Sequence, residues 1–266
     1  MPLALCATPI GNLDDITLRV LAELREADVV LAEDTRHTRG LLERHGIRAK
    51  LLSYHEHNEA ARVAELLPRL QAGERIALVT DAGMPAVSDP GARLVRAALD
   101  AGLPVTVLPG PSAVETALVA SGLGGGPYAF VGFLPRKAGE LETLWRETAA
   151  WGISVVAFES PQRLPASLRS LASFDAAREV AVCRELTKRF EEIARGPASE
   201  IAERFAEAPK GEITLVVASG SVEADSGQAR AAVADLVAAG TPRRVAADVV
   251  ARLTDMSRND LYRGSL

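Results

Sequence analysis

Short runs of β-branched and other apolar residues alternate along this chain with longer stretches rich in Ala, Leu and Arg. The short runs end at Gly or Pro turns, and the longer stretches repeat their apolar residues at helical spacing. This alternation is typical of a mostly parallel sheet covered by helices, because parallel strands need a long crossover, usually a helix, between them. The sequence therefore predicts an α/β fold.

The chain has 266 residues, of which 48% are hydrophobic, enough to bury a sizeable core in more than one domain. We expect a first parallel α/β domain over residues 1–120, a second α/β domain over residues 121–220, and a linker with a helical tail over residues 221–266. The first boundary is placed by the segment Ser121–Pro127, which holds four glycines in seven residues.

In the first domain the pattern predicts four strands and four helices: strands Leu3–Thr8, Val29–Ala32, Ile76–Thr80 and Val105–Leu108; helices Asp14–Ala27, Thr38–His45, Asn58–Gln71 and Gly91–Ala101. The second domain is expected to contain strands Tyr128–Phe133, Ser154–Phe158, Glu179–Cys183 and Glu212–Ala218, with helices near Glu140–Ala150, Arg163–Ser173 and Ser199–Glu207.

The polar segment Ser221–Gln228 is expected to be a flexible connector. Beyond it the pattern is helical from Ala229, and further helices are expected to begin at Thr241-Pro242 and at Ser257. Such a group of helices is either a nucleic-acid-binding helix-turn-helix or a docking or capping element.

Charge and cysteine content limit where this protein works and what it binds. The net charge of −5 excludes a strongly basic nucleic-acid coat protein, so any RNA contact must be a local patch. The two cysteines, Cys6 and Cys183, lie in apolar runs without metal-ligand spacing, which favours a reducing compartment. The N-terminus lacks the features of a signal peptide, and no apolar run approaches the ~18 residues of a membrane span. We expect a soluble, cytoplasmic protein.

Four Gly- and Pro-rich turns follow predicted strands and point to a ligand site. Ligands of open parallel sheets bind at the carboxyl ends of the strands, and glycine lets the backbone approach them closely. No G-x-G-x-x-G follows a strand and no G-x-x-x-x-G-K occurs, so a ligand without a pyrophosphate, such as S-adenosylmethionine, fits these turns better. The four turns are Thr8–Asn12, Thr80–Pro85, Ser88–Gly91 and Pro109–Ser112.

A series of motifs appears in order: TPIGNLDDIT, LAEDTRHT, HEHNE, VTDAGMPAVSDPG, LPGPSA, GFLPRK, FESPQRL, CRELTK and KGEITLVV. Together they resemble the tetrapyrrole methylase superfamily and, within it, the ribosomal RNA small subunit methyltransferase I family. DAGMPAVSDPG and LPGPSA are signals of the whole superfamily, whereas AEDTRHT, HEHNE and CRELTK narrow the resemblance to the ribosomal RNA methyltransferase family. It extends from about Leu3 to Ser219, and more loosely over the tail.

The resemblance implies a homodimer that binds S-adenosylmethionine in a cleft between its two α/β domains. It also implies methyl transfer to a cytidine 2′-hydroxyl in the decoding region of 16S rRNA, presented by the 30S subunit. Transferred by motif, the cofactor-binding residues are Pro9, Asp81, Gly83, Ser88, Asp89, Ser112 and Ala113 of the first domain, with Phe158, Cys183 and Thr214 of the second. Either Asp81 or Asp89 would accept from an amino group of the cofactor.

The chain departs from this family pattern in three places: Met84 stands where Thr is usual, Leu141 where Arg is common, and Gln162 where His is usual. Gln162 makes a catalytic base at that position untenable, and Leu141 removes one phosphate contact.

A ribose hydroxyl is far from ionised at neutral pH, so attack on a sulfonium methyl needs positioning first, with help from a base or cation. Charged residues expected at strand ends are the candidates, and the two favoured are Lys188 and Glu185, because CRELTK puts both just beyond a strand that faces the cleft. The others are Glu33, Asp34 and Glu159.

Basic side chains gather in three loops and suit phosphate contacts, although for a single Arg a solvated surface is the ordinary alternative. They are Arg36, His37 and Arg39; Arg136 and Lys137; and Arg184, Lys188 and Arg189. His55-Glu56-His57 lacks an evident third ligand, so no metal is expected.

Two other functions stay open at this stage. A tetrapyrrole methylase of the same superfamily would bind an acidic macrocycle, and a non-enzymatic ribosome-binding factor would keep only a vestigial cleft. The four intact turns argue against the second.

Overall fold

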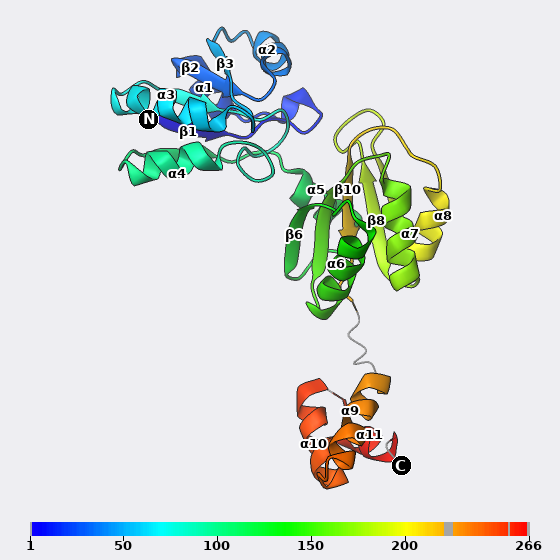
Figure 1. The fold of residues 1–266 in the computed structure, drawn as a ribbon. Coiled ribbons are helices and arrows are strands. Elements are labelled where there is room, and N and C mark those ends of the chain that lie inside the picture. The colour runs from blue at the N-terminus through cyan, green and yellow to red at the C-terminus, as the bar shows by residue number, and fades with distance from the viewer. Residues whose placement is uncertain (1, 221–225, 255, 265–266) are drawn as a thin grey trace. The chain divides into compact units, whose positions relative to one another are not determined.

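The computed structural model describes residues 2–220, 226–254 and 256–264 (Figure 1). Within them the chain forms two compact units, one of residues 1–142 and 154–218 and the other of residues 143–153 and 219–266. The first unit contains two five-stranded sheets and the second contains the C-terminal helices. No helix among the described residues is long and apolar enough to cross a membrane.

The first sheet is parallel throughout, with strand order β3-β2-β4-β1-β5. Its strands are β1 (Leu3–Cys6), β2 (Val29–Ala32), β3 (Leu51–Ser53), β4 (Ile76–Leu78) and β5 (Val105–Leu108). Because alternate residues of a strand face opposite sides, Ala4 and Val30 pack with helices α1 (Leu18–Glu26) and α2 (Thr35–Arg44). Leu3 and Leu31 pack with α3 (Glu59–Gln71) and α4 (Ala92–Asp100) instead. Both faces are covered, as expected for a parallel sheet.

The second sheet is mixed, with strand order β6-β7-β10-β8-β9. Only β6 and β7 are parallel, and the other three pairs are antiparallel. Its strands are β6 (Tyr128–Phe133), β7 (Ser154–Glu159), β8 (Glu179–Arg184), β9 (Glu192–Pro197) and β10 (Ile213–Val217). Helix α5 (Ala113–Ser121) packs on one face, where Ala117 meets Val156 and Val216. The remaining helices are α6 (Ala138–Ala150), α7 (Leu164–Phe174) and α8 (Ala198–Arg204).

The α/β prediction is confirmed, whereas three elements lie outside the predicted set: β3, β9 and α5. Strand β9 has the sequence EIARGP, whose charged, Gly and Pro residues hide the alternation of a strand. Helix α5 begins directly after the PGPS turn, so its first residues resemble a continuation of the loop. Strand β3 is only three residues long.

The C-terminal unit holds α9 (Ser226–Ala238), α10 (Arg243–Thr254) and α11 (Arg258–Gly264). The predicted starts at Thr241-Pro242 and Ser257 are confirmed, since each immediately precedes a helix. The helices share an apolar core of Ala229, Val233, Ala246, Ala247, Val250 and Leu261. Of the expected connector Ser221–Gln228, residues 221–225 lie outside the described residues, whereas Ser226–Gln228 belong to α9, so the helix begins three residues earlier than predicted.

Candidate functional site

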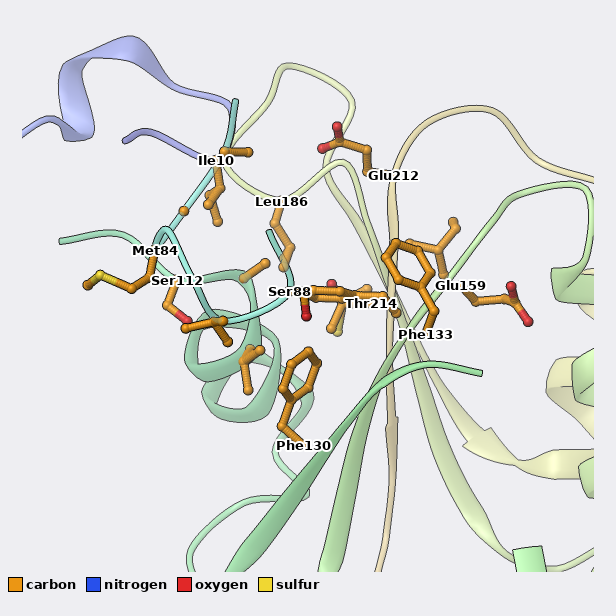
Figure 2. Close-up of a pocket in the computed structure, with 18 of the residues that line it drawn as sticks. Ile10, Met84, Ser88, Ser112, Phe130, Phe133, Glu159, Leu186, Glu212 and Thr214 are labelled. Atoms are coloured by element: carbon orange, nitrogen blue, oxygen red, sulfur yellow. The ribbon is translucent and has the colours of Figure 1, made fainter. Parts of the chain in front are cut away.

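A cavity of about 780 Å³ opens in the first unit, within the usual range for small-molecule sites (Figure 2). Turns after β4 and β5 form one wall, and strands β6, β7, β8 and β10 of the second sheet form the other. Nine of the ten residues predicted to bind a cofactor line it: Asp81, Gly83, Ser88, Asp89, Ser112, Ala113, Phe158, Cys183 and Thr214. In place of the tenth, Pro9, the wall contains its neighbour Ile10.

The turn after β4 is fixed by a two-residue antiparallel bridge to the turn after β1. The Thr8 amide donates to the Gly83 carbonyl at 2.9 Å, and the Gly83 amide donates to the Thr8 carbonyl at 3.1 Å. Gly83 has φ +82°, which a side chain would strain even though its Cβ would meet only ordinary contacts, the nearest with Ile10 Cγ2 at 3.7 Å. The Thr8 hydroxyl also donates to the Thr80 carbonyl at 2.9 Å. These bonds join the DAGMP turn to the TPIG turn.

Carboxylates concentrate at this wall. Asp81 Oδ1 accepts from the Asp34 amide at 3.1 Å, so one of its oxygens ties two strand-end loops together. Burial, helped by the charge of Asp81, raises the pKa of Asp89. Burial and the charges of Asp89 and Asp81 likewise raise the pKa of Glu33. Asp81 and Asp89 both line the cavity, and this pair of carboxylates favours a cationic ligand there.

The opposite wall is a row of three side chains on adjacent strands. Thr214 of β10 is in register with Phe158 of β7 on one side and with Cys183 of β8 on the other. Residues in register on neighbouring strands point to the same face, so the three predicted residues lie side by side. Burial raises the pKa of the Cys183 thiol to about 11, so it is a neutral, weakly polar part of the wall.

Several lining residues were missed from the sequence, and most are apolar or aromatic. An isolated Phe in a strand is ordinarily core, so nothing in the pattern distinguished them. Among them are Val87, Tyr128, Phe130, Phe133, Leu186 and Glu212. Ile10 and Met84 also line the cavity, but they belong to the predicted turns Thr8–Asn12 and Thr80–Pro85.

The favoured catalytic candidates lie in the loop between β8 and β9. Lys188 Nζ lies 2.9 Å from both Glu185 Oε1 and Glu212 Oε2, and only Glu212 of the three lines the cavity. Partial burial acts to lower the pKa of Lys188, but hydrogen bonds to Glu185 and Glu212 outweigh this effect and raise that pKa. The hydrogen bond from Lys188 lowers the pKa of Glu185. The loop is tightly wound, because Glu185 and Thr187 both have positive φ.

Gly11 explains why this loop lies where it does. The Asn12 amide donates to Thr187 Oγ1 at 2.9 Å, and a Cβ on Gly11 would come within 2.5 Å of Lys188 Cγ. Absence of a side chain at Gly11 thus allows the loop to close against the turn after β1.

Glu159 lines the cavity, but its side chain is fully buried and its carboxylate is engaged. It accepts from the Ser160 amide at 2.7 Å, from Arg163 Nη2 at 2.9 Å and from the Ser167 hydroxyl at 2.5 Å. Arg163 also donates to the carbonyls of Leu134 and Pro135. The FESPQR motif thus fastens the start of α7 to the loop after β6. Asp34, another candidate, accepts from the Arg36 amide at the start of α2.

The predicted RNA-binding residues differ in how free they are. Arg36, His37 and Arg39 are exposed at the start of α2, and the Arg36 side chain is 87% exposed although it pairs with Asp34 at 3.1 Å. Arg136 and Lys137 are exposed after β6.

The basic residues near the end of β8 are more constrained. Arg184 is held by Glu192 at 2.8 Å and by the Lys210 carbonyl. Arg189 is exposed and lies over the Phe190 ring at 5.5 Å.

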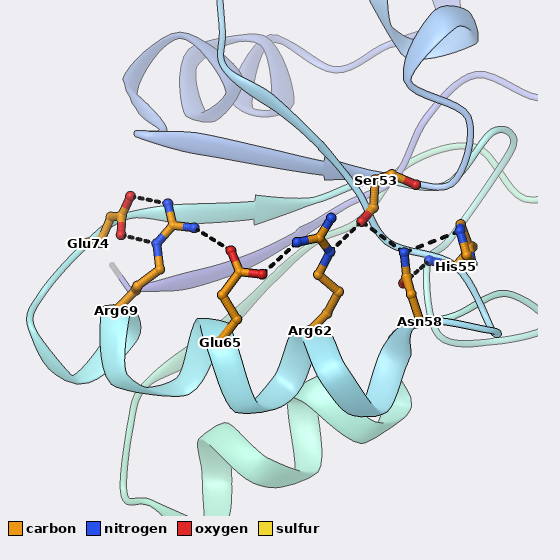
Figure 3. Close-up of polar contacts among 7 residues, drawn as sticks. All are labelled: Ser53, His55, Asn58, Arg62, Glu65, Arg69 and Glu74. Carbon is orange, nitrogen blue, oxygen red and sulfur yellow. Dashed lines mark hydrogen bonds and ion pairs between the residues drawn. The ribbon is translucent and has the colours of Figure 1, made fainter.

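The HEHNE motif closes a turn (Figure 3). Asn58 accepts from the His55 amide at 2.9 Å, and its own side-chain amide donates to the Ser53 carbonyl at 3.3 Å. Arg62 reaches the same carbonyl and begins a chain of ion pairs along α3 with Glu65, Arg69 and Glu74. These contacts fix Asn58 and the main chain of His55 in the turn before α3.

A family model for Tetrapyrrole (Corrin/Porphyrin) Methylases matches residues 2–202. The chain belongs to this family. It is also 42% identical to Ribosomal RNA small subunit methyltransferase I of Streptococcus pyogenes, over 98% of this chain and 93% of that protein. The protein of the same name from Mesorhizobium japonicum is 44% identical, over 98% of this chain and 90% of that protein. These likenesses confirm the narrower resemblance and make the chain a methyltransferase of the ribosomal RNA small subunit methyltransferase I group.

Among solved structures the fold is similar to that of the methyltransferase CobJ. The TM-score is 0.63 at 19% identity, over 82% of this chain and 93% of that one. At this identity the likeness concerns the fold alone.

Proposed function

We propose that this protein transfers a methyl group from S-adenosylmethionine to the 2′-hydroxyl of a cytidine in the decoding region of 16S rRNA. The observation that carries the proposal is the meeting of nine motif positions around one cavity, in a chain 42–44% identical to proteins named for small-subunit rRNA methylation.

The cavity fits S-adenosylmethionine chemically. Asp81 and Asp89 suit its positive groups, and the neutral row of Phe158, Cys183 and Thr214 suits its less polar parts. The Ser112 hydroxyl donates to the Glu115 carboxylate instead of capping α5, and Ala113, the first residue of that helix, lines the cavity. When bound, the cofactor supplies a methyl group activated by positive sulfur. Pro9 itself does not line the cavity, but the adjacent Ile10 of the same turn does, and Pro9 is still proposed as a contact of the cofactor.

For the hydroxyl, the residues favour positioning with electrostatic help. Lys188 is protonated at neutral pH, and hydrogen bonds to Glu185 and Glu212 raise its pKa further, so we assign it the role of a cation beside the ribose or its phosphate. Glu185 is a poor base because its pKa is lowered, and we assign it the role of holding Lys188.

Contacts to RNA are proposed for the exposed basic residues, which would bind phosphates without reading sequence. Arg36, His37 and Arg39 form one group, and Arg136 and Lys137 another. Arg189 is available as well, whereas Arg184 would first have to leave Glu192.

We further propose that the protein acts as a homodimer in the cytoplasm, on the assembled 30S subunit. We also propose that the chain divides into domains 1–120, 121–220 and 221–266, because the first two each contain a separate sheet.

The deciding experiment measures transfer of labelled methyl groups from S-adenosylmethionine to 30S subunits, free 16S rRNA and a uroporphyrinogen-type tetrapyrrole. We expect label in 30S subunits, recovered as 2′-O-methylcytidine after digestion. Label in the tetrapyrrole alone would support the alternative substrate. No cofactor binding by calorimetry would support the non-enzymatic factor.

A further inference from the structure

Strand β6 contains an irregularity that changes where its last aromatic residue points. Phe130 pairs with Val156 of β7, and Phe133 pairs with Phe158, so three steps along β6 match two along β7. One extra residue is therefore inserted, and Gly132 within it has φ +70°. In a regular strand Phe130 and Phe133 would face opposite sides of the sheet.

Because of this bulge both phenylalanines line the same cavity (Figure 2). Phe130 and Phe133 each contact the Phe158 ring edge to face, with ring centroids 4.9 and 5.5 Å away. They differ in exposure: Phe130 is partly buried, whereas Phe133 is 62% exposed. Phe133 is thus a large apolar ring held at the cavity with much of its surface still open to solvent.

The loop that follows Phe133 is rigid and basic. Leu134 and Pro135 are fixed through their carbonyls by Arg163, which Glu159 holds in turn. Arg136 and Lys137 come next and are exposed. A ring beside a cavity, followed within a few residues by cations, combines the two chemistries that bind a single nucleotide: stacking on its base and charge on its phosphate.

We infer that Phe133 stacks on the base of the nucleotide whose ribose is methylated, and so positions that nucleotide at the cavity. The inference rests on the proposed function, and it adds the residue that holds an unstacked base. Recognition of single-stranded RNA commonly stacks a splayed base on an aromatic side chain, which offsets part of the stacking lost when the base leaves its neighbours. Stacking on Phe133 is indifferent to base identity, so this residue positions the nucleotide without selecting cytosine.

The test compares Phe133→Leu, Phe133→Tyr and a control, Phe174→Leu, in the full-length protein. Phe174 is also a partly exposed phenylalanine, at the end of α7, and does not line the cavity. For each protein, kcat/KM is measured with 30S subunits that lack the modification, and the Kd for S-adenosylmethionine by calorimetry. Thermal melting checks the fold.

Phe133→Leu should lower kcat/KM for subunits by about 5- to 150-fold, the loss expected when a stacked base loses its aromatic partner. Phe133→Tyr should restore most of it, the control should match the wild type, and cofactor affinity should change less than about twofold in all three. Normal kcat/KM in Phe133→Leu would overturn the inference. A loss of cofactor affinity equal to the loss in kcat/KM would also overturn it, by assigning the ring to the cofactor. If the wild-type protein transfers no methyl group to subunits, the proposed function itself fails.

Discussion

Replacing Glu159 by Gln separates a structural carboxylate from a catalytic base. The glutamine side chain has the same shape, but it offers only one acceptor oxygen. Ser160 donates to Oε1 of Glu159, whereas Arg163 and Ser167 both donate to Oε2. A carbonyl oxygen at the Oε2 position keeps the contacts to Arg163 and Ser167, while the NH2 group then faces the Ser160 amide, which is itself a donor. Two of the three contacts can therefore persist without the negative charge.

The cost follows from those contacts. A hydrogen bond to a charged group contributes about 1.5–3 kcal/mol and a neutral one about 0.5–1.5 kcal/mol, so each of the two retained bonds loses about 1 kcal/mol, and the Ser160 amide left without its acceptor costs about 1–3 kcal/mol more. Because the Arg163 side chain is 29% exposed and partly screened, the total should be about 3 kcal/mol. Glu159→Ala removes every contact and leaves Arg163 without its carboxylate, for which about 3–5 kcal/mol is expected.

Urea unfolding followed by tryptophan fluorescence measures the stability of both variants, and methyl transfer at a temperature well below melting measures turnover. We expect Glu159→Gln to keep kcat within a few-fold of the wild type. A general base would instead lose about 10²- to 10⁴-fold. Wild-type stability combined with such a loss of kcat would refute the structural role of Glu159.

Three further outcomes are expected. If the charge of Lys188 assists the hydroxyl, Lys188→Ala should lower kcat by about 10²-fold even at saturating 30S subunits. Recovery of the rate at saturation would limit Lys188 to binding phosphate. An unchanged rate at all subunit concentrations would show that Lys188 takes no part. The raised pKa of Asp89 means that the folded state binds a proton there more readily than the unfolded state, so folding stability falls as pH rises through this range. Asp89→Asn should therefore melt higher than the wild type at pH 7, yet bind S-adenosylmethionine more weakly. The wild-type affinity for the cofactor should fall as Asp89 is protonated at low pH. A cofactor affinity that stays constant across pH in calorimetry would contradict this expectation. Replacing Arg36 and Arg39 together by Ala should weaken 30S binding and reduce the slope of log K against log salt by about 1.5, with cofactor affinity unchanged, and an unaltered slope would remove these residues from the RNA surface.

What could be inferred from the sequence followed from local rules. Alternating apolar runs predicted the α/β class, since burial on both faces of a parallel sheet needs continuous apolar strands and amphipathic helices. Gly83 and its neighbours marked a ligand-binding edge, because such turns follow strands whose carboxyl ends meet at one edge. Nine of the ten residues transferred from the family resemblance line one cavity, so it was the resemblance carried by the motifs that had grouped them.

Tertiary structure decided what depends on partners distant in the sequence. Glu159 and Lys188 looked alike as charged residues near strand ends, yet one is enclosed by Ser160, Arg163 and Ser167 and the other bridges Glu185 and Glu212. Strand pairing was equally hidden, because the direction of a strand is set by its neighbours and not by its own residues. The bulge in β6 shows this most directly: only pairing with β7 turns Phe133 to the cavity side, since a shift of one residue exchanges the two faces of a strand.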